Sequence, residues 1–140
     1  MSGLILKLRP HEEILINGAI IENGGYKTRL RIKSESVNIL RLRDAIAGKD
    51  ATTPLKQAYF IAQCAVSGEL PPDVASDQIK IALLKVAAET ECSAELFLRI
   101  EEARKSGNFY CAMRTIGALM KQNGETLHPQ ERPLWGDTSL

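Results

Sequence analysis

The chain has 140 residues, of which 44% are hydrophobic and 25% charged, and its net charge is only +1. This size allows one compact domain or two small lobes on a shared core, and the composition excludes a disordered chain. No stretch reaches the ~18 apolar residues of a membrane span, and the first residues lack the features of a signal peptide. The three cysteines are far apart and odd in number, so we expect buried, reduced thiols, a cytoplasmic location and no membrane contact.

The charge is distributed unevenly along the chain. Residues 1–49 contain nine Lys or Arg and five Asp or Glu, whereas residues 50–140 contain nine basic and twelve acidic residues. A basic segment joined to an acidic one indicates two surfaces with different partners.

Residues 4–42 show the two-residue period of β-strands. Apolar residues alternate with Lys and Arg over residues 4–9 and again over 27–33, and residues 14–16 and 37–42 are also β-prone. Asn17-Gly18 is a strong hairpin signal. Gly24-Gly25 is interpreted as a second hairpin turn rather than a phosphate-binding loop, because no helix follows it. We predict four or five short antiparallel strands in a small sheet or barrel-like lobe.

After Gly48 the hydrophobic period changes to that of α-helices, and four helices are expected. Their expected N-terminal caps are Thr53, Asp73 or Ser76, Ser93, and Asn108. Residues 126–140 have no period, and the lone Trp135 either docks on the helices or forms a linear binding motif. The predicted fold class is α+β, with a basic β-rich lobe (1–49), an antiparallel bundle of about four helices (50–124) and an irregular tail (125–140).

No arrangement of residues typical of catalysis or metal binding is found. His11 and His128 belong to no catalytic or metal-binding pattern with a cysteine or a carboxylate, and no CxxC, HExxH, GxSxG or phosphate-loop motif occurs. The adjacent acids Glu12-Glu13 and Glu101-Glu102 point in divergent directions on a strand or a helix. We therefore expect no enzymatic activity, no metal and no cofactor.

The informative chemical feature is a row of cations, one at every second position from residue 27 to residue 33. Such residues share one strand face at ~6–7 Å spacing, which is comparable to the phosphate spacing of nucleic acid. A solvated strand face with no ligand can carry the same pattern. Further cations on the first and last strands favour RNA binding, because Arg grips phosphates and stacks on bases. The predicted RNA-binding residues are Lys7, Arg9, Lys27, Arg29, Arg31, Lys33, Arg41 and Arg43.

Tyr26 is the only aromatic residue in this basic segment. An RNA-recognition motif, which stacks bases on several aromatic side chains, is therefore not expected. Recognition would depend on arginines and backbone groups instead.

Four segments resemble, in order, the FlbT family of flagellar regulators. They are residues 4–10 (LILKLRP), 13–19 (EILINGA), 26–32 (YKTRLRI) and 53–59 (TPLKQAY). The resemblance extends from Leu4 to about Asn123. It implies a post-transcriptional repressor that binds the 5′ untranslated region of flagellin mRNA and promotes its degradation during flagellum biogenesis. It also implies that a second flagellar protein, FlaF, opposes this activity.

The first third also resembles CsrA-type RNA-binding proteins, through residues 4–9 (LILKLR), 12–16 (EEILI) and 39–46 (ILRLRDAI). In that family arginines on the outer strands of an intertwined dimer hold a single-stranded GGA-containing loop. Arg9 matches the basic end of its first strand, and Arg43 matches the arginine of its last strand. Leu8 stands where that family has a second arginine, and the helical part has no counterpart there.

These observations give two competing expectations. The first is an mRNA-binding, post-transcriptional repressor of flagellin synthesis that binds the flagellin leader RNA. The second is a protein-binding adaptor or chaperone for a flagellar component, with indirect effects on RNA, indicated by the acidic helical part and the Trp135 tail. The protein partners considered are a FlaF-like regulator, flagellin and a second copy of the chain.

Overall fold

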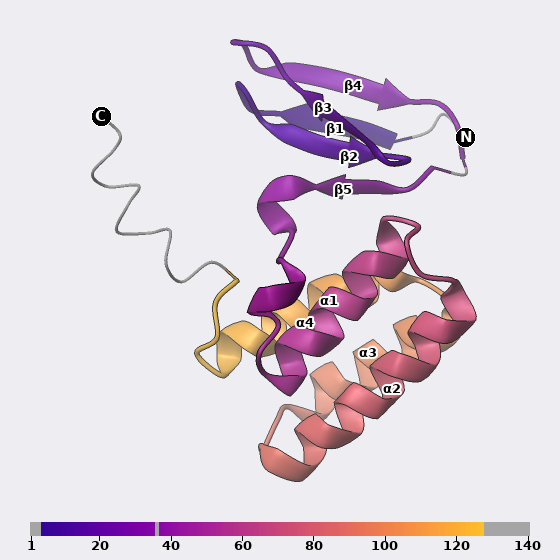
Figure 1. Ribbon diagram of the computed structural model, residues 1–140, viewed down its shortest axis with the longest axis vertical. Helices are drawn as coiled ribbons and strands as arrows, with labels where there is room; N and C mark the ends of the chain where they lie inside the picture. Colours follow the sequence, from indigo (N-terminus) through magenta and orange to yellow (C-terminus); the bar gives the residue numbers. More distant parts are fainter. Residues whose placement is uncertain (1–3, 36, 128–140) are drawn as a thin grey trace.

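The alternating first third folds into five short strands in the computed structural model, which describes residues 4–35 and 37–127. The strands are β1 (Leu4–Leu8), β2 (Glu13–Ile16), β3 (Ala19–Glu22), β4 (Thr28–Ile32) and β5 (Ile39–Arg41). All pairings are antiparallel, and they form a two-stranded β1–β4 ribbon and a three-stranded sheet in the order β3-β2-β5. Four helices follow, so the predicted α+β class is confirmed (Figure 1).

The β1–β4 ribbon packs its apolar face on the three-stranded sheet. Leu6 and Leu8 of β1 are buried against Ile14 of β2, and partly buried residues of β4 and β5 complete this small core. Every second side chain of a strand points to the same face. Because apolar residues alternate with Lys and Arg in β1 and β4, most of the apolar side chains share the buried face of the ribbon. The other face of the ribbon is left to solvent.

The opposite face of the three-stranded sheet joins the helical core. Leu15 of β2 and Leu40 of β5 lie directly opposite each other in the register, and both contact the main cluster of buried residues from the helices. The molecule therefore has three layers, which are the ribbon, the sheet and the helices. The ribbon is the layer furthest from the helices (Figure 1).

The two predicted turns have different outcomes. Asn17 and Gly18 both have positive φ angles, of 49° and 87°, as a tight hairpin between β2 and β3 requires, so that turn is confirmed. The expected hairpin turn at Gly24-Gly25 is wrong, because β3 pairs only with β2 and β4 only with β1. The Asn23 amide donates to the carbonyl oxygens of Arg9 and Tyr26, which directs the chain away from β3 and toward the end of β1.

Two short 3-10 turns, η1 (Leu42–Asp44) and η2 (Gly48–Asp50), lead from the sheet to the helices. The segment between them is fixed to the first helix. Gln63 accepts a hydrogen bond from the Ile46 N–H at 2.8 Å and donates to the Ile46 carbonyl at 3.0 Å. The Tyr59 hydroxyl donates to the Asp44 carbonyl at 2.6 Å. The β layers are thus attached to the helices by hydrogen bonds as well as by apolar contact.

The helices are α1 (Pro54–Val66), α2 (Pro72–Glu89), α3 (Ala94–Ser106) and α4 (Phe109–Gln122). The predicted caps Thr53, Ser93 and Asn108 are confirmed, since each side-chain oxygen accepts a backbone N–H from the first helical turn. The predicted cap of α2 is wrong. That helix begins after Pro71, and the proline at this cap position has no side-chain oxygen that could accept a backbone N–H of the first turn. Ser76 instead accepts a hydrogen bond from Arg104 of α3.

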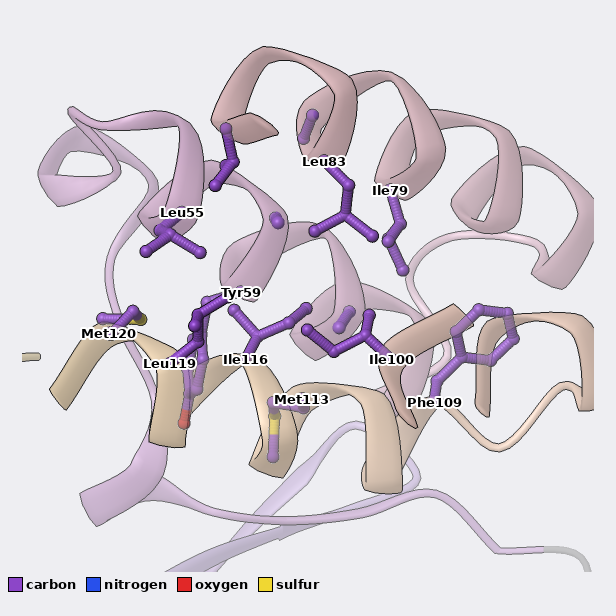
Figure 2. Packing of buried hydrophobic residues seen from close by; sticks show 14 of the residues in the cluster. Leu55, Tyr59, Ile79, Leu83, Ile100, Phe109, Met113, Ile116, Leu119 and Met120 are labelled. Carbon is purple, nitrogen blue, oxygen red and sulfur yellow. The ribbon is translucent and has the colours of Figure 1, made fainter. Parts of the chain in front are cut away.

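The helical core contains side chains from all four helices. Figure 2 shows Ile79 and Leu83 of α2 pointing toward Ile100 of α3 and Ile116 of α4. No helix in the part of the chain that the structure describes is long and apolar enough to cross a membrane.

The three cysteines are all free, but the expectation that they are buried is wrong, since none of them is fully buried. Cys64 and Cys92 are partly buried, whereas Cys111 is exposed on the outer side of α4. Burial raises the pKa of the Cys64 thiol to about 11, so this group stays protonated at neutral pH. The predictions for His128, Trp135 and most of the tail lie outside the described residues.

Candidate nucleic-acid interface

The register of the β1–β4 ribbon places cations from two strands on one face. Lys7 lies directly opposite Arg29, and Ile5 lies opposite Arg31, while Leu6 and its partner Leu30 face the core. The side chains on this outer face are exposed. The basic face is therefore the solvent side of the ribbon.

An open pocket of about 520 Å³ lies where β1 ends and β4 begins. Five of the eight predicted RNA-binding residues line it, together with Leu8 and Thr28. These five are Lys7, Arg9, Lys27, Arg29 and Arg43. They come from three separate parts of the chain, which the ribbon and the η1 turn bring together. We refer to this site as the cationic pocket.

The other three predicted residues lie elsewhere. Arg31 is exposed further along β4, and Lys33 is exposed just after this strand ends, toward the other end of the ribbon. Arg41 is in register with Ile14 and turns inward between the two β layers, so its side chain is only 20% exposed. Its guanidinium donates to the Lys7 carbonyl at 3.1 Å and to Glu12 Oε2 at 2.8 Å. Arg41 thus connects β5 to β1 behind the pocket.

Glu12 is the charge partner that holds two of the arginines in place. Its side chain is only 5% exposed, and Oε2 lies 2.8 Å from Arg41 Nη1 and 3.7 Å from Arg43 Nε. The other oxygen, Oε1, accepts the Arg9 N–H at 2.9 Å. Burial alone would raise the pKa of this carboxyl, but these hydrogen bonds and the two positive charges outweigh burial and hold the pKa below its usual value. Glu12 is therefore ionised at neutral pH.

Sequence reasoning did not identify Glu12 or Asn23 as parts of the site. In the sequence, Glu12 stands out as one of two adjacent acids that diverge and as part of the segment 12–16 that resembles CsrA-type proteins, and the structure does separate it from the exposed Glu13. A sequence signal existed for Glu12, because it is an acid within a basic segment and follows a proline turn. No local signal points to Asn23, since its two hydrogen-bond acceptors lie in different parts of the chain.

The chemistry available at this site is anion binding. Five cationic side chains surround one open pocket, and the nearby Glu12 carboxylate is already engaged by Arg41 and Arg43. Arg and Lys side chains bind phosphate oxygens through charge-assisted hydrogen bonds. Among the described residues no group of three or more His, Cys, Asp or Glu side chains could hold a metal ion.

Comparison with known proteins identifies related chains. Residues 4–127 match the model of a family described as flagellar protein FlbT. A protein of Rhodopseudomonas palustris strain TIE-1, named probable flagellum biosynthesis repressor protein FlbT, is 30% identical over 129 residues, which cover 89% of this chain and 97% of that protein. A protein of the same name from Allorhizobium ampelinum is 30% identical over 133 residues, covering 93% of this chain and 87% of the relative.

A shorter match has higher identity. The Bradyrhizobium diazoefficiens protein named probable flagellum biosynthesis repressor protein FlbT 1 is 40% identical over 61 residues, which cover 44% of this chain and 42% of that protein. No solved structure matches this chain. The resemblance of the first strands to CsrA-type proteins stays an interpretation of the sequence.

Proposed function

This chain belongs to the FlbT family of flagellar proteins, and from this membership we propose that it represses flagellin synthesis after transcription. In this proposal the protein binds the 5′ untranslated region of flagellin mRNA and promotes degradation of the message. Its relatives from Rhodopseudomonas and Allorhizobium are named as probable repressors of flagellum biosynthesis, which is a regulatory role.

The observation that carries the RNA-binding part is the cationic pocket. Lys7, Arg29 and Arg43 reach it from β1, β4 and η1, so its charge depends on the folded arrangement and not on one basic stretch of sequence. Cations concentrated at one place attract the phosphates of RNA more strongly than the same charges spread over a surface. The helices lie on the other side of the molecule and leave this face open (Figure 1).

The direct test is binding of the purified protein to a labelled flagellin leader RNA. Lys7→Ala combined with Arg29→Ala removes two facing cations of the pocket, and neither side chain is part of a hydrophobic core. Loss of two charge-assisted contacts should weaken binding by at least about tenfold. In cells the same double variant should lengthen the half-life of flagellin mRNA.

Lys80→Ala combined with Lys85→Ala is the matched control, because it removes two exposed cations from α2. This control should bind the leader RNA like the wild type. Equal weakening by both double variants would mean that only overall charge matters, and it would contradict a site on the ribbon. Failure of the wild type to bind the leader RNA would exclude direct RNA recognition.

A second candidate function is a protein-binding adaptor or chaperone for a flagellar component. The observation that favours it is a set of large apolar side chains exposed on the helices, Ile81 at 55%, Leu84 at 62% and Leu98 at 65%. Ile81 and Leu84 are three residues apart on α2 and therefore share one face of that helix, as a protein-binding surface requires. If this function holds, Leu84→Ser with Leu98→Ser should abolish co-purification with flagellin or a FlaF-like protein, and Lys7→Ala with Arg29→Ala should not.

A further inference from the structure

Tyr26 stands beside the cationic pocket with its side chain in solvent. It is 84% exposed, the highest value among the large hydrophobic side chains exposed in the described part of the chain. The next residue, Lys27, lines the pocket, as do Thr28 and Arg29. An aromatic ring that the protein itself does not cover is available to a ligand that occupies the pocket.

The backbone of Tyr26 is held in place while its ring is exposed. Its carbonyl oxygen accepts hydrogen bonds from Asn23 Nδ2 at 2.8 Å and from Thr28 Oγ1 at 3.1 Å. The same Asn23 amide donates to the Arg9 carbonyl at 2.7 Å, and the His11 N–H donates to the Gly24 carbonyl at 2.9 Å. These bonds fix the loop that carries the ring to the end of β1, where Arg9 lines the pocket. The backbone position of Tyr26 relative to the pocket is therefore defined by the fold.

We infer that Tyr26 and the cationic pocket together form a subsite for one nucleotide of single-stranded RNA. The pocket cations bind the phosphate, and the exposed ring of Tyr26 stacks on the base. This inference rests on the proposed RNA-binding function and specifies which form of RNA the site takes. In a duplex both faces of a base are already stacked on neighbours, so a duplex offers phosphates to the pocket but no base to the ring.

The experiment measures binding of the full chain to a labelled leader oligonucleotide, single-stranded or annealed to its complement. Tyr26→Ala should weaken binding of the single strand by about 5- to 150-fold, the range expected for loss of one base–aromatic stack. Its binding of the duplex should equal that of the wild type. Tyr26→Phe keeps the ring and should bind the single strand within about twofold of the wild type.

Tyr110→Ala is the matched control, because Tyr110 is a second exposed tyrosine, 48% exposed on α4, and does not line the pocket. This control should bind both forms of RNA like the wild type. Single-strand binding by Tyr26→Ala equal to that of the wild type would overturn the subsite and leave the proposed function intact. An equal loss for single strand and duplex would also overturn it, since the effect would then lie in the loop and not in stacking. Wild-type protein that binds neither RNA would overturn the proposed function itself.

Discussion

At the scale of single residues, the candidate site depends on a carboxylate, that of Glu12, which does not line the cationic pocket. Glu12 is nearly buried, accepts the Arg9 N–H, and holds the guanidinium groups of Arg41 and Arg43. A buried carboxylate requires such partners, because burial of an unpaired charge is unfavourable by several kcal/mol. Glu12 therefore stabilises the β layers and also holds the pocket residues Arg9 and Arg43 in position.

Glu12→Gln should lower the free energy of unfolding at neutral pH by about 1–3 kcal/mol, because it removes the charge that compensates the two arginines. The pKa of Glu12 in the folded protein lies below its usual value of 4.5. Its contribution is therefore present above that pH and is lost as the pH falls through the lower folded-state pKa. Denaturant unfolding of wild type and variant should accordingly differ at pH 7 and converge in acid.

Glu13→Gln is the control for this measurement, since it changes the neighbouring but exposed carboxylate. Its unfolding free energy should stay within about 0.5 kcal/mol of the wild type, as is usual for surface changes. A Glu12→Gln variant as stable as the wild type at pH 7 would contradict the structural role of Glu12.

At the scale of elements, one of the two expected turns and three of the helix caps, which depend on neighbouring residues, could be predicted from the sequence. The pairing of strands that are distant in the chain could not. The Asn17-Gly18 hairpin and the caps of α1, α3 and α4 depend on neighbouring residues and are confirmed. Pairing of β1 with β4 joins segments about twenty residues apart, and no local pattern distinguishes it from pairing of β3 with β4. For the same reason the sequence predicted the basic face of β4 but not the inward turn of Arg41, whose partners lie on other strands.

The start of α4 gives a prediction at this scale. Asn108 Oδ1 accepts the Cys111 N–H at 3.0 Å, and the residue before it, Gly107, ends α3 with a positive φ of 79°. Asn108→Ala should lower the free energy of unfolding by about 1 kcal/mol, because the first turn of α4 loses its cap. Denaturant unfolding monitored by far-UV circular dichroism measures this change.

Asp73→Ala is the informative comparison, since Asp73 is one of the two residues expected to cap α2, and α2 has no side-chain cap. Its effect should be limited to the interaction of a charge with the helix dipole, about 0.5 kcal/mol. A larger loss from Asp73→Ala than from Asn108→Ala would contradict the observed capping.

At the scale of the whole molecule, the β layers and the helices share contacts that make them one structural unit. Leu15 and Leu40 of the sheet pack into the helical core, and Gln63 and Tyr59 of α1 hydrogen-bond the segment that follows β5. The division of the chain at residue 49 stays a prediction from composition. The pocket lies on the ribbon, so its geometry depends on this whole stack of layers.

Gln63→Leu removes the hydrogen-bond partner of both the N–H and the carbonyl of Ile46. Each buried group that loses its hydrogen bond should lower the free energy of unfolding by about 1–3 kcal/mol. The exposed Gln57 of the same helix provides the control Gln57→Leu, which should change stability by less than about 0.5 kcal/mol. Because the β layers and the helices share a core, hydrogen exchange of the strand amides and far-UV circular dichroism of the helices should report one common unfolding free energy for the wild type. Two different unfolding free energies would contradict a single unit.

The measurement that tests the central claim most directly is the salt dependence of leader-RNA binding. Neutralisation of phosphates by the five pocket cations should give a slope of about −3.5 for log affinity against log salt concentration, at about −0.7 per contact for a single strand. The Lys7→Ala/Arg29→Ala variant should show a slope of about −2, and the Lys80→Ala/Lys85→Ala control should keep the wild-type slope. Wild-type affinity that does not change with salt, or a pocket variant that keeps the wild-type slope, would contradict RNA binding by the cationic pocket.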